Sequence, residues 1–166
     1  MKYIKSVHRH GSKLFLLVVI NDKSLEPTNI IKASTSINGI KSIISECEGI
    51  NWYNNQSINK IKYNLEKKIK TYYRINIKAN SGFFNINPNT DYSKIKKYLD
   101  LTVNHYIKIW QNYKGNEYAP FHGDLSLVGN VMFNTKDEVL FVDWEQFDVN
   151  VKMPTGLDIV MTLMEN

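Results

Sequence analysis

The stretch that most constrains the fold runs from Ala119 to Phe147 and reads APFHGDLSLVGNVMFNTKDEVLFVDWEQF. It places an HGD tripeptide and a VDWE tetrapeptide on either side of two short apolar runs, residues 131–133 and 139–142. A polar loop of the kind found in hairpins joins the two runs. The sequence therefore predicts a β-hairpin that brings Asp124 and Asp143 toward each other.

Two carboxylates separated by about twenty residues suit a phosphoryl-transfer site. One carboxylate orients the attacking hydroxyl, and the other holds the metal of a metal–nucleotide complex. Asp124 and Asp143 match these two roles in that order.

The sequences HGDLSLVGN and FVDWE resemble the catalytic loop and the metal-binding segment of the aminoglycoside phosphotransferase and choline kinase group, small-molecule relatives of the protein kinases. The resemblance implies that Asp124 is the catalytic-loop aspartate and that His122 is the structural histidine before it. It also implies that Asp143 and Asn130 are the metal ligands. The family usually places its asparagine five residues after the catalytic aspartate, whereas Asn130 follows six residues after Asp124. A one-residue bulge is therefore expected near Gly129, which supplies the bend.

The order of the elements expected upstream is similar to that family. Strands are expected at Tyr3–Val7 and Leu14–Ile20. The turn between them contains Gly11 and either covers nucleotide phosphates or is an ordinary hairpin turn; both interpretations stay open. The next strand, Asn29–Ala33, carries Lys32, which resembles the lysine that contacts the α- and β-phosphates in kinases.

A helix is expected from Gly39 to about Tyr53, because apolar residues recur there at the spacing of one helical face. In the resemblance, a glutamate of this helix positions Lys32. Glu46 borders the apolar face and is the favoured partner, and Glu48, on the other edge, is the competitor.

The rest of the chain divides into further helices and strands. An amphipathic helix is expected at Ser57–Thr71, with Ser57 as its N-cap, and strands are expected at Tyr72–Ala79 and Gly82–Ile86. A hinge is expected at Asn87–Asp91. It is followed by a long helix at Ser93–Tyr113, in which His105 is expected to be structural, and by a last helix that begins at Pro154. An adenine ring is expected to lie against the hinge. Asp158, in the last helix, resembles the aspartate that braces the family's catalytic loop.

The implied fold is α+β, with the two lobes of a protein kinase-like architecture. Residues 1–87 are expected to form a β-rich N-lobe, and residues 88–166 a mainly helical C-lobe. The kinase-like fold ordinarily has several helices after the metal-binding aspartate, and few residues follow Asp143. The C-lobe is therefore expected to be incomplete and the chain to be truncated at its C-terminus. Whether such a chain is active by itself stays open.

Composition limits the setting in which the protein works. With 166 residues, of which 43% are hydrophobic and 22% charged, the chain has a globular composition. It contains no run long and apolar enough for a membrane span or a signal peptide, and its single cysteine, Cys47, excludes an internal disulfide. A cytoplasmic protein is therefore expected. The net charge of +5 comes from lysines spread along the chain without an arginine-rich patch, so no nucleic-acid partner is expected.

The expected activity is transfer of the γ-phosphoryl group of ATP to a hydroxyl of a small molecule, with Mg²⁺ rather than zinc because the candidate ligands are oxygens. The resemblance implies an amino alcohol, an aminoglycoside, a sugar or a glycoconjugate precursor as the acceptor. One alternative is a non-catalytic nucleotide-binding or interaction domain of the same fold. Another is a metal-dependent hydrolase that uses His122, Asp124 and Asp143. Neither the substrate nor the oligomeric state follows from the sequence.

Overall fold

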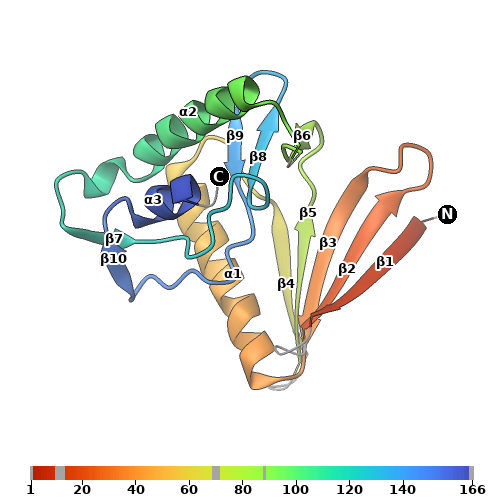
Figure 1. Cartoon of the computed structure of the whole chain (residues 1–166). Coiled ribbons are helices and arrows are strands. Elements are labelled where there is room, and N and C mark those ends of the chain that lie inside the picture. Colours follow the sequence, from red (N-terminus) through yellow and green to blue (C-terminus); the bar gives the residue numbers. More distant parts are fainter. Residues whose placement is uncertain (1, 10–13, 69–71, 88, 165–166) are drawn as a thin grey trace. The chain divides into compact units, whose positions relative to one another are not determined.

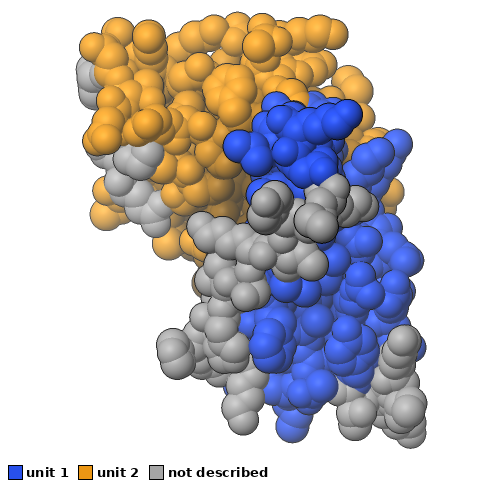
Figure 2. All heavy atoms as spheres, turned by 90° about the vertical axis from the view of Figure 1, so that its right-hand side faces the viewer, with its two compact units in different colours: residues 1–47, 61–81 blue, residues 48–60, 82–166 orange. Residues whose placement is uncertain are grey.

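A computed structural model describes residues 2–9, 14–68, 72–87 and 89–164. In this part of the chain, every strand pairing is antiparallel and three α-helices accompany the strands. The expected mixture of helices with antiparallel sheet is confirmed. Contacts divide the chain into two compact units, which Figure 2 colours separately. Unit 1 comprises residues 1–47 and 61–81, and unit 2 comprises residues 48–60 and 82–166. The expected lobe boundary at residue 87 stays a prediction.

Unit 1 is built on one five-stranded sheet with the order β1-β2-β3-β5-β4 (Figure 1). Its elements are β1 (Lys2–Arg9), β2 (Leu14–Asn21), β3 (Pro27–Ser34), β4 (Tyr63–Lys68), β5 (Tyr72–Lys78) and the first part of helix α1 (Ile37–Gln56). Leucine, valine and isoleucine dominate β2, and tyrosine and isoleucine make up most of β5, as suits a pleated, half-buried surface. Four of these strands and the helix were expected from the sequence. The side chain of Cys47, the single cysteine of the sequence, is buried.

The helix expected at Ser57–Thr71 is wrong. Residues 63–68 form strand β4, in which Tyr63 lies opposite Ile77 and Leu65 opposite Ile75 of β5. Ile61, Tyr63 and Leu65 also alternate with the period of a strand, so the local pattern fitted both structures. Pairing with β5 satisfies backbone groups along the whole strand, and this long-range gain decided the conformation. Ser57 is not an N-cap, because its N–H donates to the Tyr53 carbonyl at the end of α1.

Unit 2 combines the last part of α1 with two small sheets and two further helices. Its elements are β6 (Phe83–Phe84), α2 (Tyr92–Ile109), the 3₁₀ helix η1 (Gln111–Tyr113), β7 (Tyr118–Pro120), β8 (Val131–Asn134), β9 (Val139–Phe141), β10 (Lys152–Pro154) and α3 (Leu157–Met164). Strands β6, β8 and β9 form one sheet, beside which α2 runs, and β7 pairs with β10 (Figure 1). The β8–β9 hairpin confirms the expected one. No helix in the described residues is long and apolar enough to cross a membrane.

Helix α2 begins close to the expected position and ends earlier. Asp91 is its N-cap, because Asp91 Oδ1 accepts a hydrogen bond of 2.8 Å from the N–H of Ser93. The α-helical part stops at Ile109, and the last residues of the expected helix form the tighter η1. His105 is structural, as expected: its Nε2 lies 2.9 Å from the Tyr53 hydroxyl, and burial lowers its pKa to about 4.

Candidate functional site

Asp124 lies in an irregular loop, residues 121–130, which connects β7 to β8 and is called here the Asp124 loop. The carboxylate of Asp158, on α3, holds the start of this loop. Its Oδ2 accepts from the N–H of His122 at 2.9 Å, and its Oδ1 accepts from the N–H of Gly123 at 3.0 Å. Burial raises the pKa of Asp158, while these two hydrogen bonds favour the ionised form. Asp158 therefore makes the bracing contact that the resemblance implied.

His122 links the Asp124 loop to the chain just before Asp143. Its side chain is completely buried, and its Nε2 lies 3.0 Å from the carbonyl oxygen of Val142. A carbonyl only accepts hydrogen bonds, so Nε2 carries the proton. Nδ1 is then the acceptor that faces the N–H of Asp124 at 3.4 Å. The ring is therefore a neutral brace whose two nitrogens both face backbone groups.

Asn130, at the end of the Asp124 loop, bonds back to Asp124 and forward to the chain just before Asp143. Its Nδ2 donates to the carbonyl oxygen of Asp124 at 2.5 Å, and its own carbonyl accepts from the N–H of Val142 at 3.0 Å. The extra residue before Asn130 is absorbed in a turn, in which the Ser126 carbonyl accepts from the N–H groups of Asn130 and of the residue after it. Gly129 is not required for this bend: its backbone is not left-handed, and an added Cβ would lie 3.6 Å from Ser126 Oγ, an ordinary contact.

The loop passes close to residues 142–147, called here the Asp143 segment. Gly123 has φ +90°, and a Cβ at this position would lie 2.9 Å from the Cβ of Gln146. Asp143 itself adopts φ 65°, a left-handed conformation that is uncommon for a residue with a side chain and is often found at functional sites. Asp124 is exposed and Asp143 is half-buried. Unit 2 therefore holds the two aspartates on neighbouring, tightly bonded segments.

An aromatic cluster packs around Trp144 of the Asp143 segment. Trp144 is fully buried, and its ring centroid lies 4.3 Å from that of His122 and 5.3 Å from that of Tyr53. Its Nε1 donates to the Phe141 carbonyl at 3.0 Å. Gly49 of α1 faces this cluster, and a Cβ there would lie 2.5 Å from the Cβ of Trp144. The helix approaches the Asp143 segment this closely only because residue 49 has no side chain.

We expect Gly49→Ala to destabilise the protein by about 1 kcal/mol net, because over-packing a core costs roughly 1–3 kcal/mol and the alanine would contact two Cβ atoms. Helix propensity acts in the opposite direction, favouring alanine by about 1 kcal/mol. Urea unfolding measures the change. Asn55→Ala, at an exposed position of α1, is the matched control and should be neutral or slightly stabilising. A Gly49→Ala protein as stable as the wild type would contradict the close packing of Trp144.

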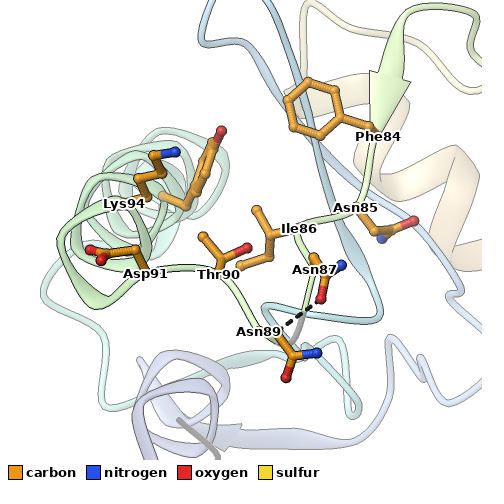
Figure 3. Close-up of a pocket in the computed structure, with 9 residues that line it drawn as sticks. Phe84, Asn85, Ile86, Asn87, Asn89, Thr90, Asp91 and Lys94 are labelled. Carbon is orange, nitrogen blue, oxygen red and sulfur yellow. Dashed lines mark hydrogen bonds between the residues drawn. The ribbon is translucent and has the colours of Figure 1, made fainter.

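A hollow of about 380 Å³ lies beside the segment expected to be a hinge. Figure 3 shows Phe84, Ile86 and Thr90 around it, with Asp91 and Lys94 at the start of α2. Asn87 turns back and accepts a hydrogen bond from the N–H of Asn89 at 2.9 Å (Figure 3). The role of this segment as a hinge beside an adenine ring stays a prediction.

In unit 1, Lys32 and Glu46 form a buried ion pair. Lys32 Nζ lies 2.6 Å from Glu46 Oε2, and the two side chains are 7% and 2% exposed. Glu48 is exposed, so the structure selects Glu46 between the two glutamates considered. Gly11 lies outside the described residues, and its contact with phosphates stays a prediction.

Sequence reasoning missed two contributors to the site. Gly49 is one of them, and no local signal in the sequence marks its contact with Trp144. The hydroxyl of Thr162, a residue that the sequence analysis does not single out, contacts the Asp124 loop. Its spacing of four residues from Asp158 was a usable signal, because residues at this spacing share one face of a helix.

In comparisons with known proteins, no family model and no curated protein matches the chain. The resemblance to the aminoglycoside phosphotransferase and choline kinase group therefore rests on the residues of the two motifs. What it implies about activity belongs to the proposal that follows.

Proposed function

We propose that the protein is an ATP-dependent phosphotransferase of the kinase-like two-lobe architecture, which transfers the γ-phosphoryl group of ATP to a hydroxyl of a small molecule. The observation that carries the proposal is the geometry of the Asp124 loop. The side chains of Asp158, His122 and Asn130 form hydrogen bonds with its backbone, while the Asp124 side chain is exposed. A fixed backbone with an accessible carboxylate is what orientation of an attacking hydroxyl requires.

In the proposed reaction, the substrate oxygen forms a bond to the γ-phosphorus as the bond between that phosphorus and the bridging oxygen of ADP breaks. The hydroxyl proton passes to the carboxylate of Asp124, and ADP leaves with the bonding electron pair. Lys32, oriented by Glu46, contacts the α- and β-phosphates. Most of the rate comes from positioning and electrostatics rather than from covalent chemistry of the protein.

Asp143 and Asn130 are the residues that would hold magnesium. Their side chains fit, because Asn130 Nδ2 is engaged by the Asp124 carbonyl and the other amide atom, Oδ1, is a hard oxygen donor like the Asp143 carboxylate. The bond between the Val142 N–H and the Asn130 carbonyl keeps the backbones of these two donors adjacent. When bound, the ion neutralises charge on the phosphates.

The hydrolase alternative requires His122 as a metal ligand, and the tautomer and burial of its ring disfavour that role. Nε2 is directed at the Val142 carbonyl, and the unprotonated Nδ1, the nitrogen that a metal would need, already accepts from the N–H of Asp124. The histidine therefore favours the phosphotransferase, in which it braces the loop.

We expect Asp143→Asn to weaken binding of Mg-ATP at least roughly tenfold, since even indirect contacts to a metal are worth about 10–100-fold in affinity. Isothermal calorimetry measures the affinity, and transfer of labelled phosphate to a panel of aminoglycosides, amino alcohols and sugars measures turnover. Asp148→Asn is the matched control, because Asp148 caps a turn nearby by accepting from the N–H of Asn150. Unchanged Mg-ATP affinity in Asp143→Asn would remove Asp143 from this role. Binding by the wild type without transfer to any acceptor would favour the non-catalytic domain.

A further inference from the structure

Thr162 is a completely buried polar residue on α3, one turn after Asp158. Its hydroxyl approaches the carbonyl oxygen of Asp158 at 2.7 Å, which is the usual contact of a helical threonine with the residue four positions earlier. The same hydroxyl also faces the carbonyl oxygen of Leu125, and because it carries one hydrogen, its donation is shared between the two carbonyls. This second bond leaves the helix and ends on the Asp124 loop.

The contacts of α3 lie on both sides of Asp124. Asp158 accepts from the N–H groups of the two residues before Asp124, His122 and Gly123. Thr162 donates to the carbonyl of Leu125, the residue after it. Positions four apart lie on one face of a helix, so a single face of α3 bonds the loop before and after Asp124. The loop has no strand or helix of its own to hold this residue.

We propose that Thr162 is a positioning residue for Asp124, which acts by fixing the carbonyl of Leu125; the catalytic part of this inference rests on the proposed function. Leu125 is buried, so water does not readily replace a lost donor to its carbonyl. Of these contacts between α3 and the loop, removal of the hydroxyl leaves the hydrogen bonds to Asp158, which lie on the side that precedes Asp124. A carboxylate that must meet a hydroxyl in a defined geometry loses activity when it is displaced by a fraction of an ångström.

The test compares Thr162→Val, which keeps the shape and removes the hydroxyl, with Thr162→Ser, which keeps the hydroxyl. The matched control is Thr102→Val, because Thr102 is also fully buried and its hydroxyl bonds at 2.8 Å to a carbonyl of its own helix, away from the loop. If either valine variant fails to fold, Thr162→Ala and Thr102→Ala repeat the comparison. Two quantities are measured: amide hydrogen exchange in residues 121–130, and transfer of labelled phosphate from Mg-ATP to the acceptor panel.

We expect Thr162→Val to accelerate amide exchange in the Asp124 loop and to lower kcat, each on the order of tenfold, with little change in affinity for Mg-ATP. Thr162→Ser should restore both, and Thr102→Val should change neither. Faster loop exchange in Thr162→Val together with an inactive wild type would support the anchoring of the loop and count against the phosphotransferase instead. Loop exchange in Thr162→Val equal to that in Thr102→Val would overturn the inference, whatever the activity.

Discussion

Asp124→Asn is expected to lower kcat by about 10²–10⁴-fold while leaving the affinity for Mg-ATP almost unchanged, because asparagine has the size of aspartate but cannot accept the substrate proton. The bonds that hold Asp124 in the loop run through its backbone, from its N–H to His122 and from Asn130 to its carbonyl. The substitution leaves these bonds in place. The loss should therefore appear in the chemical step and not in folding.

Single-turnover transfer of labelled phosphate and calorimetry with Mg-ATP separate the two effects. Asp100→Asn is the control, because Asp100 is an exposed aspartate of α2 that pairs with Lys96. An Asp124→Asn protein with wild-type turnover would exclude a role for this carboxylate in proton transfer. A joint loss of metal affinity and activity would instead identify Asp124 as a metal ligand.

The second large effect is expected at the buried ion pair of unit 1. Lys32→Met should destabilise the protein by about 3–5 kcal/mol, because it removes the ammonium partner from a buried carboxylate. The double variant Lys32→Met/Glu46→Leu should recover most of this loss, since an apolar pair of similar volume is often as stable as a buried ion pair. If Lys32 contacts the phosphates as proposed, the affinity of the double variant for Mg-ATP should nevertheless stay low, because that cation is missing.

Urea unfolding of the two single variants and the double variant measures the coupling free energy between Lys32 and Glu46. The pair between Arg74 and Glu66 is the control, because it lies on the same sheet at 3.4 Å with side chains about one-third exposed. Exposed pairs contribute roughly 0–1 kcal/mol, so Glu66→Gln should have little effect. A double variant that regains both stability and Mg-ATP binding would mean that Lys32 has only a structural role.

The sequence was a reliable guide where one local pattern had a single solution. The apolar runs around Phe133 and Leu140 are joined by a polar loop, and they form the expected hairpin. Helical spacing placed Glu46 and Glu48 on the two edges of the apolar face of α1 and favoured Glu46, which is the glutamate that pairs with Lys32. These features depend on neighbours within a few residues, which a periodicity records.

Residues 63–68 show where a local pattern was insufficient. Their apolar residues fitted the period of a helix and that of a strand, and the unpaired edge of β5 selected the strand. The fold also removes the expected need for glycine at position 129. The turn that absorbs the extra residue uses the Ser126 carbonyl and leaves room for a side chain.

The sequence by itself therefore determined the residue types of the candidate site and the hairpin that separates Asp124 from Asp143. Only the tertiary structure decided how that site is held. Gly49 faces Trp144, and Thr162 bonds to Leu125 across 37 residues of chain. The two partners of each contact are far apart in the sequence, and the residues around one partner carry no pattern that indicates the other. Only the packing of the whole unit decides which helix surface meets which loop.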